Sequence, residues 1–355
     1  MNRRDFIRQG SAAAVAALGA RAFAADAPVR RLRIAQVGTA HSHAAGKWEA
    51  LCRRTDLFDC RGIWEPDPGL RRAAQRRPEY AGARWLEEGE FFHADLQAVA
   101  VETELPDLLP LGRRVLEAGW HLHLDKPPGT DLAAFAALQD LAGRRGLVLQ
   151  TGYMFRYHPA FQFCLQAAQA GWLGPVFAVH GDIGKVIAPD RRAWLAENYG
   201  GSMLLLGCHL LDLAVALLGV PDRATPYRRR TRPEHDAYFD NEMAVLEYPR
   251  AVATIRSLLC EVGGDERRQV VVCGENGTVE IMPLEPARVR LTLQQAAGGY
   301  PAGAHAVPLP EVRFRYDEML RDFHGRANGA PSLQPRFTPA HDLAVQRLLL
   351  QVGRA

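Results

Sequence analysis

Apolar positions in the first half of the chain fall into short buried-type strands that alternate with amphipathic helices. The strands are rich in aliphatic and β-branched residues and stop at glycine, proline or acidic residues. They are predicted over residues 31–37, 58–64, 96–101, 120–124 and 147–151. The helices between them are predicted over residues 47–54, 108–118 and 132–144. This alternation predicts a doubly wound α/β (Rossmann) domain over residues 25–150, with a parallel sheet covered on both faces.

The second half of the chain has a different pattern, in which strands follow one another with few helices between them. Helices are predicted over residues 159–170, 202–218 and 339–352. Strands are predicted over residues 176–182, 242–248, 251–258, 269–273, 278–282 and 289–294. This order predicts an α+β domain over residues 151–355, built on a large and mostly antiparallel sheet. The basic run Arg228–Arg230 is interpreted as a solvated loop.

Composition limits the class of protein but does not identify it. The 355 residues are 48% hydrophobic and 23% charged, which fits two globular domains and excludes a disordered chain, collagen and a polytopic membrane protein. The formal net charge is +3. The first 24 residues hold four arginines and one acid, Asp5, so the rest of the chain is formally neutral. Charge therefore gives no reason to expect a nucleic-acid partner.

Residues 1–24 have the layout of an export signal. Arg3 and Arg4 are followed by Phe6, an alanine-rich stretch over residues 11–20 and a small-x-small end at residues 22–24. This resembles a twin-arginine (Tat) signal peptide, and its apolar run is shorter than the roughly 20 residues that span a bilayer. We expect export by the Tat machinery to the periplasm, with no stable membrane insertion. A frayed basic amphipathic helix is the alternative.

The end of the first predicted strand carries a weakened dinucleotide fingerprint. Glycines in this motif allow a tight turn and a close approach of the backbone to the pyrophosphate. Glu65 follows the second strand, where a carboxylate takes the ribose hydroxyls and repels a 2′-phosphate, so NAD is favoured over NADP. A Rossmann-like domain without a nucleotide is the alternative. The predicted contacts here are Gly38, Thr39, Ala40, His41, Ser42, His43, Glu65 and Thr103.

Four segments in sequence carry a family resemblance. They are IAQVGTAHSHAAGKW (34–48), GWHLHLDKPP (119–128), TGYMFRYHPAF (151–161) and GGSMLLLGCHLLDL (200–213). From about Leu32 onward the chain resembles the Gfo/Idh/MocA oxidoreductases. The resemblance implies a Rossmann domain, a sheet-based substrate domain and a homo-oligomer. It also implies NAD(P)-dependent hydride transfer to or from a hydroxyl of a carbohydrate or polyol.

The resemblance assigns the chemistry to three residues. Lys126 matches the lysine of the family's E-K-P motif, and is predicted to contact both the nicotinamide ribose and a substrate hydroxyl. His209 matches the catalytic histidine, which takes the hydroxyl proton because its pKa lies near working pH. Asp212, one helical turn further on, is predicted to orient the imidazole. Many relatives carry an Asp where this chain has Leu205, so the usual Asp–Lys–His group lacks its acid.

Substrate contacts are predicted at the start of the second domain and at its first strand. They are Tyr153, Arg156, Asp182, Lys185 and His209, with surface solvation as the alternative for Asp182 and Lys185. No metal site is predicted, because the six cysteines form no C-x-x-C pair or metal-finger spacing.

Export and a dinucleotide site together predict a tightly bound NAD that is reduced and reoxidised in place. A sugar oxidoreductase satisfies that requirement. A glycoside-cleaving enzyme that oxidises a ring hydroxyl transiently satisfies it as well. A degenerate member that binds sugar or nucleotide without turnover is the third interpretation, suggested by Leu205 and the missing glycines.

Overall fold

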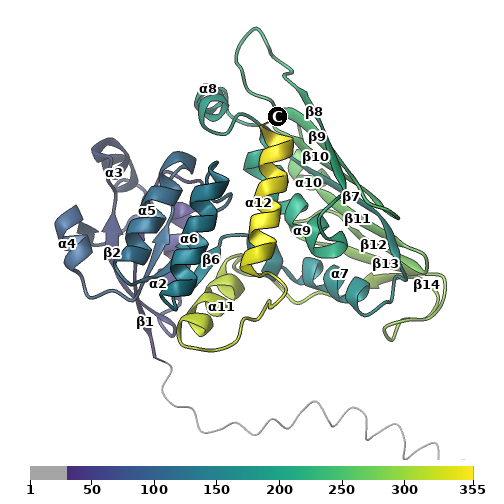
Figure 1. Ribbon diagram of the computed structural model, residues 1–355, viewed down its shortest axis with the longest axis horizontal. Helices are drawn as coiled ribbons and strands as arrows, with labels where there is room; N and C mark the ends of the chain where they lie inside the picture. The colour runs from purple at the N-terminus through teal and green to yellow at the C-terminus, as the bar shows by residue number, and fades with distance from the viewer. Residues whose placement is uncertain (1–29, 355) are drawn as a thin grey trace, which may run out of the picture.

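The computed structural model describes residues 30–354, which form two domains side by side with helix α12 (Pro339–Gly353) standing between them (Figure 1). The export signal predicted over residues 1–24 lies outside the described residues. Within residues 30–354, none of the helices combines the length and apolarity needed to cross a membrane.

The first domain is built on a six-stranded parallel sheet in the order β3-β2-β1-β4-β5-β6. Its strands are β1 (Leu32–Val37), β2 (Phe58–Trp64), β3 (Trp85–Leu86), β4 (Ala98–Val101), β5 (His121–Leu124) and β6 (Leu149–Thr151). Its helices are α2 (Ala44–Arg53), α3 (Pro68–Ala74), α4 (Glu88–His93), α5 (Leu105–Glu117) and α6 (Leu132–Arg144). The doubly wound parallel sheet predicted from the sequence is confirmed. Strand β1 pairs with both β2 and β4, so the order of the strands reverses beside β1.

The second domain is built on an eight-stranded sheet in the order β14-β13-β12-β11-β7-β10-β9-β8. Its strands are β7 (Val176–Gly184), β8 (Arg223–Arg229), β9 (Asn241–Glu247), β10 (Val252–Leu258), β11 (Gln269–Gly274), β12 (Gly277–Ile281), β13 (Val289–Leu293) and β14 (Gly303–Val307). Only the β7–β10 pair of this sheet is parallel. The predicted α+β architecture with a mostly antiparallel sheet is confirmed.

Helices of the second half of the chain fill the space between the two sheets (Figure 1). They are α7 (Pro159–Gln169), α8 (Pro189–Asn198), α9 (Cys208–Leu218), α10 (Gly264–Arg267), α11 (Asp317–Ala327) and α12, with a short 3₁₀ turn, η3 (Met154–Tyr157). Helix α12 packs against α9 of its own domain and against α6 of the first domain. The last helix therefore fastens the two domains together.

Two predicted elements differ from the structure. The helix predicted over residues 202–218 begins with a π-helical turn, η4 (Met203–Gly207), before α9. The basic run Arg228–Arg230 is not wholly a loop, because Arg228 and Arg229 end the edge strand β8. Arg228 is anchored there by its Nε, which lies 2.6 Å from Oε1 of the buried Glu242. The sequence of this strand, RATPYRR, lacks the apolar run from which strands are predicted.

Candidate active site

The turn after β1 has the geometry that a dinucleotide loop requires. Gly38 has a φ of +85°, and its N–H donates to the carbonyl of Trp64. A Cβ on Gly38 would lie 2.4 Å from Cγ2 and 2.9 Å from the backbone nitrogen of Thr103. Glycine is therefore needed here for both conformation and space. Of the predicted contacts, Gly38 and Thr103 meet directly at the ends of β1 and β4.

Glu65 holds this loop in place. Its Oε2 accepts hydrogen bonds of 2.6 Å from both the backbone N–H and the hydroxyl of Thr39, and its Oε1 accepts one from the N–H of Asp67. The predicted role was contact with ribose hydroxyls. In the structure the Glu65 carboxylate accepts three hydrogen bonds from the protein itself, and Glu65 also lines the adjoining cavity.

A cavity of about 720 Å³ opens at the carboxyl ends of β1, β2 and β4. This is where the strand order of the sheet reverses, and open α/β sheets bind their ligands at that point. Its volume suits a nucleotide-sized ligand. The lining includes three predicted cofactor contacts and residues from helix α8 of the second domain: Ala40, Glu65, Thr103, Arg191 and Trp194.

Two loop histidines converge on Asp125, at the end of β5. Nδ1 of His41 lies 2.8 Å and Nδ1 of His43 lies 3.2 Å from Oδ2 of Asp125, whereas Ser42 is exposed. These three side chains have the spacing of metal ligands. However, the carboxylate is already paired with both rings and has Nζ of Lys47 3.8 Å away. We assign the cluster to positioning the loop, with burial lowering the pKa of His43 to about 3.

A buried ionic network under the loop was missed by sequence reasoning. The ammonium of Lys47, on α2, donates to Oε1 of Glu102 at 2.9 Å and to Nε2 of His123 at 2.6 Å. His123 is thereby neutral and holds its Nδ1 proton toward the side-chain oxygen of Gln150, 2.9 Å away. Burial and Lys47 lower the pKa of His123 to about 3. The one sign of this network in the sequence is Lys47 itself, which lies on the apolar face of α2.

Lys126 reaches across to the second domain. The residue is 2% exposed, and its Nζ donates a 3.0 Å hydrogen bond to the carbonyl of Leu205. Leu205 lies in the π-helical turn η4, a type of turn that is frequent at functional sites. The main-chain oxygen thus gives Lys126 an acceptor at the position where the family's Asp was expected. Lys126 has no carboxylate within 4 Å among residues 30–354.

His209 lies on α9 with its ring edge-on to Phe155 and Tyr153, at centroid distances of 5.0 and 5.8 Å. Burial, followed by the charges of Lys126 and His43, holds its pKa well below the ordinary value. The ring is therefore neutral, but it is a weaker base than the imidazole with a pKa near working pH that the sequence predicted. Its buried Nδ1 and the buried hydroxyl of Tyr153 have no hydrogen-bond partner among the described residues. A bound molecule can satisfy both atoms.

Asp212 does not orient His209, which corrects the prediction. Its carboxylate accepts two hydrogen bonds from Arg156, of 2.7 and 2.9 Å, and faces Nε2 of His341 at 2.8 Å. Arg156 also donates to Asp342 at 2.6 Å and is buried, so its guanidinium is engaged by two carboxylates of the protein, and the substrate contact predicted for it stays a prediction. The helical spacing placed Asp212 and His209 on one face, but a bidentate guanidinium from η3 offered the carboxylate a stronger partner.

Asp182 and Lys185 lie at the end of β7 with different surroundings. Asp182 is paired within the sheet, to Nε of Arg256 at 2.6 Å and to the side-chain amide of Gln269 at 2.8 Å. The backbone of Lys185 donates to the carbonyl of Leu258, but its ammonium has no carboxylate within 4 Å in the described part of the chain. The Asp182 carboxylate is thus engaged by neighbouring strands, whereas the Lys185 ammonium has no carboxylate partner among residues 30–354.

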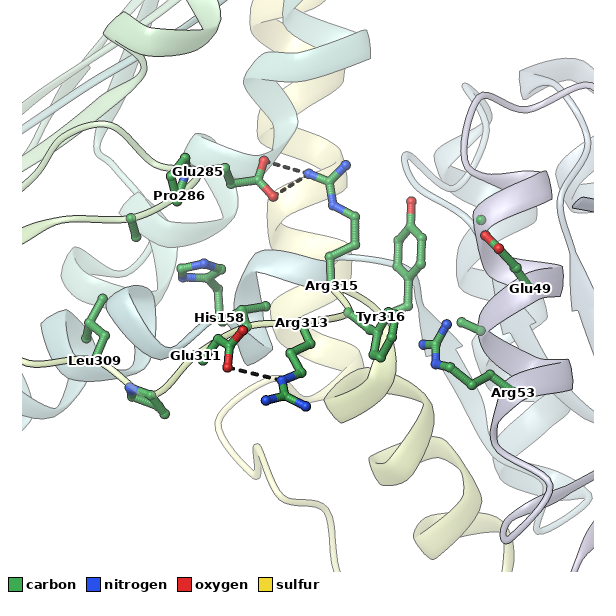
Figure 2. A pocket seen from close by; sticks show the side chains of 16 residues that line it. Glu49, Arg53, His158, Glu285, Pro286, Leu309, Glu311, Arg313, Arg315 and Tyr316 are labelled. Carbon is green, nitrogen blue, oxygen red and sulfur yellow. Dashed lines mark hydrogen bonds and ion pairs between the residues drawn. The ribbon is translucent and has the colours of Figure 1, made fainter.

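A second cavity of about 620 Å³ separates α2 from the segment before α11 (Figure 2). Figure 2 shows the Arg315 side chain extended to the carboxylate of Glu285, with two contacts of 2.5 Å. Tyr316 lies beside Arg315, and its ring centroid is 5.8 Å from that of His43. This cavity therefore adjoins the loop. Sequence reasoning missed these residues because they lie in a stretch without a recognisable pattern.

Comparison with known proteins is consistent with this geometry. Residues 161–280 match the model of the GFO/IDH/MocA C-terminal domain. The dTDP-3,4-didehydro-2,6-dideoxy-alpha-D-glucose 3-reductase of Streptomyces violaceoruber is 31% identical over 200 residues, which are 54% of this chain and 56% of the relative. The uncharacterized oxidoreductase YdgJ of Escherichia coli is 28% identical over 65% of this chain and 67% of its own. The chain thus spans little more than half of the first relative.

Solved structures share the fold over nearly the whole chain. The aldose-aldose oxidoreductase of Caulobacter crescentus, complexed with glycerol, superposes with a TM-score of 0.75 at 20% identity. The match covers 92% of this chain and 98% of that one. The UDP-N-acetylglucosamine 3-dehydrogenase of Acidithiobacillus ferrooxidans has the same TM-score and coverage at 19% identity. At these identities the likeness concerns the fold.

Proposed function

We propose that the chain is a Gfo/Idh/MocA oxidoreductase that oxidises or reduces a hydroxyl carbon of a carbohydrate or polyol with NAD, because residues 161–280 match the C-terminal domain of that family and both domains share the fold of a solved aldose-aldose oxidoreductase. One observation carries the proposal. Among residues 30–354, the buried ammonium of Lys126 has no carboxylate within 4 Å and donates to the carbonyl of Leu205, four residues before His209, whose buried neutral imidazole has no hydrogen-bond partner on Nδ1.

The cavity at the carboxyl ends of β1, β2 and β4 fits the adenosine and pyrophosphate part of the cofactor. The left-handed Gly38 brings the backbone close to this cavity, and the first turn of α2 follows directly. A helix N-terminus favours a phosphate group there. When bound, the nicotinamide exchanges a hydride with the hydroxyl carbon of the substrate.

Lys126 and His209 divide the remaining work. The ammonium of Lys126 hydrogen-bonds the hydroxyl oxygen and stabilises the negative charge that develops on it. His209 takes the hydroxyl proton on Nδ1 during oxidation and returns it during reduction. The carbonyl of Leu205 holds Nζ of Lys126 and stands in for the missing carboxylate as a positioning group.

The charge of the nucleotide cavity supports NAD rather than NADP. Its two guanidinium groups are already paired, Arg114 with Glu88 at 2.5 Å and Arg191 with Glu104 at 3.2 Å. Five acids line the cavity: Glu65, Asp67, Glu88, Glu104 and Asp107. Such a lining repels a 2′-phosphate. Affinities for NAD and NADP, measured by calorimetry, test this point, and tighter binding of NADP would contradict it.

Export through the Tat pathway to the periplasm is part of the proposal and rests on residues 1–24. A periplasmic enzyme meets little free NAD, so the cofactor is retained and each reduction is matched by an oxidation in place. Mass spectrometry of the small molecules released from the purified protein on denaturation tests retention. Release of no nucleotide would contradict it.

A glycoside-cleaving activity is the second candidate, and the 620 Å³ cavity beside the loop favours it. Transient oxidation of a ring hydroxyl acidifies the neighbouring C–H bond, elimination expels the aglycone, and hydration and re-reduction restore the sugar. The cavity offers room for an aglycone. Incubation with nitrophenyl glycosides separates the two activities, because only a cleaving enzyme releases nitrophenol.

Absorbance of the reduced nicotinamide after addition of sugars tests turnover itself. We expect a redox change in the wild-type protein that Lys126→Ala and His209→Ala each abolish. If the wild type binds nucleotide and sugar but gives no redox change with any aldose or polyol tested, the protein is a degenerate binding member and the enzyme proposal fails.

A homo-oligomer is proposed from the family resemblance alone. Light scattering coupled to size-exclusion chromatography measures the mass of the particle, and a mass near the 39.2 kDa of one chain would contradict the proposal.

A further inference from the structure

The distribution of lysine in this chain is unusual. Lys and Arg number 43, and only three of them are lysines: Lys47, Lys126 and Lys185. Two are buried outright and the third is partly buried, so nearly every surface cation is an arginine. A lysine in a chain with this bias is therefore a position at which to look for a role of its own. Lys47 serves the buried network and Lys126 the proposed chemistry, whereas Lys185 has only the general substrate contact that the sequence predicted for it.

Lys185 stands at an edge of the large sheet where several loops converge. Strands β7, β10, β12 and β14 end at this edge, because β7 and β10 are parallel and β11 and β13 run the opposite way. Lys185 follows β7, Arg268 precedes β11, Glu285 lies between β12 and β13, and Arg315 follows β14. The topology thus brings residues from four distant segments together.

Contacts confirm this convergence. Nε of Arg268 donates a 3.0 Å hydrogen bond to the carbonyl of Gly184, the residue before Lys185. A terminal nitrogen of Arg268 lies 3.9 Å from the Glu285 carboxylate, which Arg315 also contacts at 2.5 Å. Two guanidinium groups therefore share one carboxylate.

Among residues 30–354 the carboxylates at this edge are engaged by other cations, Glu261 by Arg267 and Glu285 by Arg268 and Arg315, so none lies within 4 Å of the Lys185 ammonium. Burial lowers the pKa of Lys185, and the charges of Arg268 and Lys126 lower it further, while Asp265 opposes them. Asp265 is itself in contact with Arg268 and its side chain is 67% exposed. A partly buried ammonium without a carboxylate is costly unless an anion joins it.

We propose that Lys185, with Arg268 and Arg315 beside it, holds a negatively charged group of the substrate, a carboxylate or a phosphate. The site prefers an acidic sugar, such as a uronic acid or a sugar phosphate, over a neutral one. Guanidinium and ammonium groups together match the oxygens of either anion. The inference rests on the proposed function and adds the substrate class to it.

Calorimetry on the full-length, NAD-loaded protein tests the inference with D-glucuronate, D-glucose 6-phosphate and D-glucose as probes. We expect at least one acidic probe to bind more tightly than glucose, and the two acids to distinguish a carboxylate site from a phosphate site. Lys185→Met is expected to weaken the preferred acid by about tenfold or more, as loss of a charged hydrogen bond does, and to leave glucose unchanged. Lys185→Arg is expected to keep most of the preference.

Arg250→Met is the matched control, because Arg250 is an exposed cation paired with Glu275 on another edge of the sheet. Equal binding of all three probes, tighter binding of glucose, or no binding of either acid would overturn the inference. A Lys185→Met protein that still prefers the acidic probe but has a strongly reduced kcat would also overturn the inference, because Lys185 would then take part in proton transfer. Failure of the proposed function appears separately, as absence of a redox change that depends on Lys126 and His209.

Discussion

Lys47 and Lys126 are both buried, yet their surroundings differ in kind. Lys47 has a carboxylate at 2.9 Å, an imidazole nitrogen at 2.6 Å and a second carboxylate at 3.8 Å. Lys126 has one main-chain carbonyl at 3.0 Å. The chain itself neutralises the first lysine, which therefore stabilises the fold. Among residues 30–354 the second has no carboxylate within 4 Å, and in the proposed function the reacting oxygen of the substrate supplies the negative charge.

Lys47→Met is expected to have the largest effect on stability. Removing one partner of a buried ionic network leaves Glu102 uncompensated, which costs about 3–5 kcal/mol of unfolding free energy. Urea denaturation measures this loss. The double variant Lys47→Met/Glu102→Gln is expected to recover part of it. A loss under 1 kcal/mol would show that Lys47 is no better neutralised than Lys126.

Lys126→Met is expected to reverse that pattern, with a large effect on turnover and a small one on stability. Loss of a group that stabilises developing charge lowers kcat by about 10²–10³-fold. Single-turnover absorbance of the bound nicotinamide measures this fall, and urea denaturation gives the accompanying change in stability. A variant with normal turnover and a strongly reduced unfolding free energy would place Lys126 with Lys47 as a structural residue.

Asp212→Asn separates structure from chemistry on α9. Because Arg156 keeps Asp342 as a partner, the unfolding free energy is expected to fall by about 1–3 kcal/mol. The pH profile of kcat/KM is expected to remain that of the wild type, since Asp212 contacts Arg156 and His341. A shift of the profile in Asp212→Asn, absent from Asp342→Asn, would restore the orienting role that the sequence predicted.

His123→Gln tests the buried network through pH, with an effect expected only in acid. The pKa of His123 is about 3 in the folded protein and near 6.5 in the unfolded chain, so the unfolded state binds the extra proton as pH falls. Its contribution to stability is complete above pH 6.5 and is lost toward pH 3. We expect His123→Gln to reduce the slope of the unfolding free energy against pH by about 1.4 kcal/mol per pH unit between pH 6 and 4. An unchanged slope would contradict the assigned protonation state.

Periodicity was enough to predict the two sheets. The strands of the first domain are buried on both sides and read as short apolar runs, and those of the second alternate with turns. Strand β8, whose residues are mostly arginine and polar, escaped prediction because an edge strand needs backbone pairing and little apolar surface. The two-residue β3 escaped because it is too short to show a period.

The candidate site was only partly predictable. Glycine chemistry pointed to Gly38, and the family resemblance pointed to Lys126 and His209, which lie in the interior where the predicted chemistry needs them. Nothing in the sequence pointed to the carbonyl of Leu205 as the partner of Lys126, because every residue has a main-chain oxygen and only the fold decides which one lies within reach. Nor did it show that Arg156 would draw Asp212 away from His209, since the competing partner lies 56 residues away.

The sequence by itself determined the architecture, because the spacing of apolar residues governs which face of each helix or strand is buried. It also determined which side chains are available: three lysines, a glycine after β1, and a histidine on an apolar helix. Only the tertiary structure decided which of the lysines has its charge neutralised. That outcome depends on groups within about 4 Å in space, and residues from distant strands meet at that distance only after the sheets have formed.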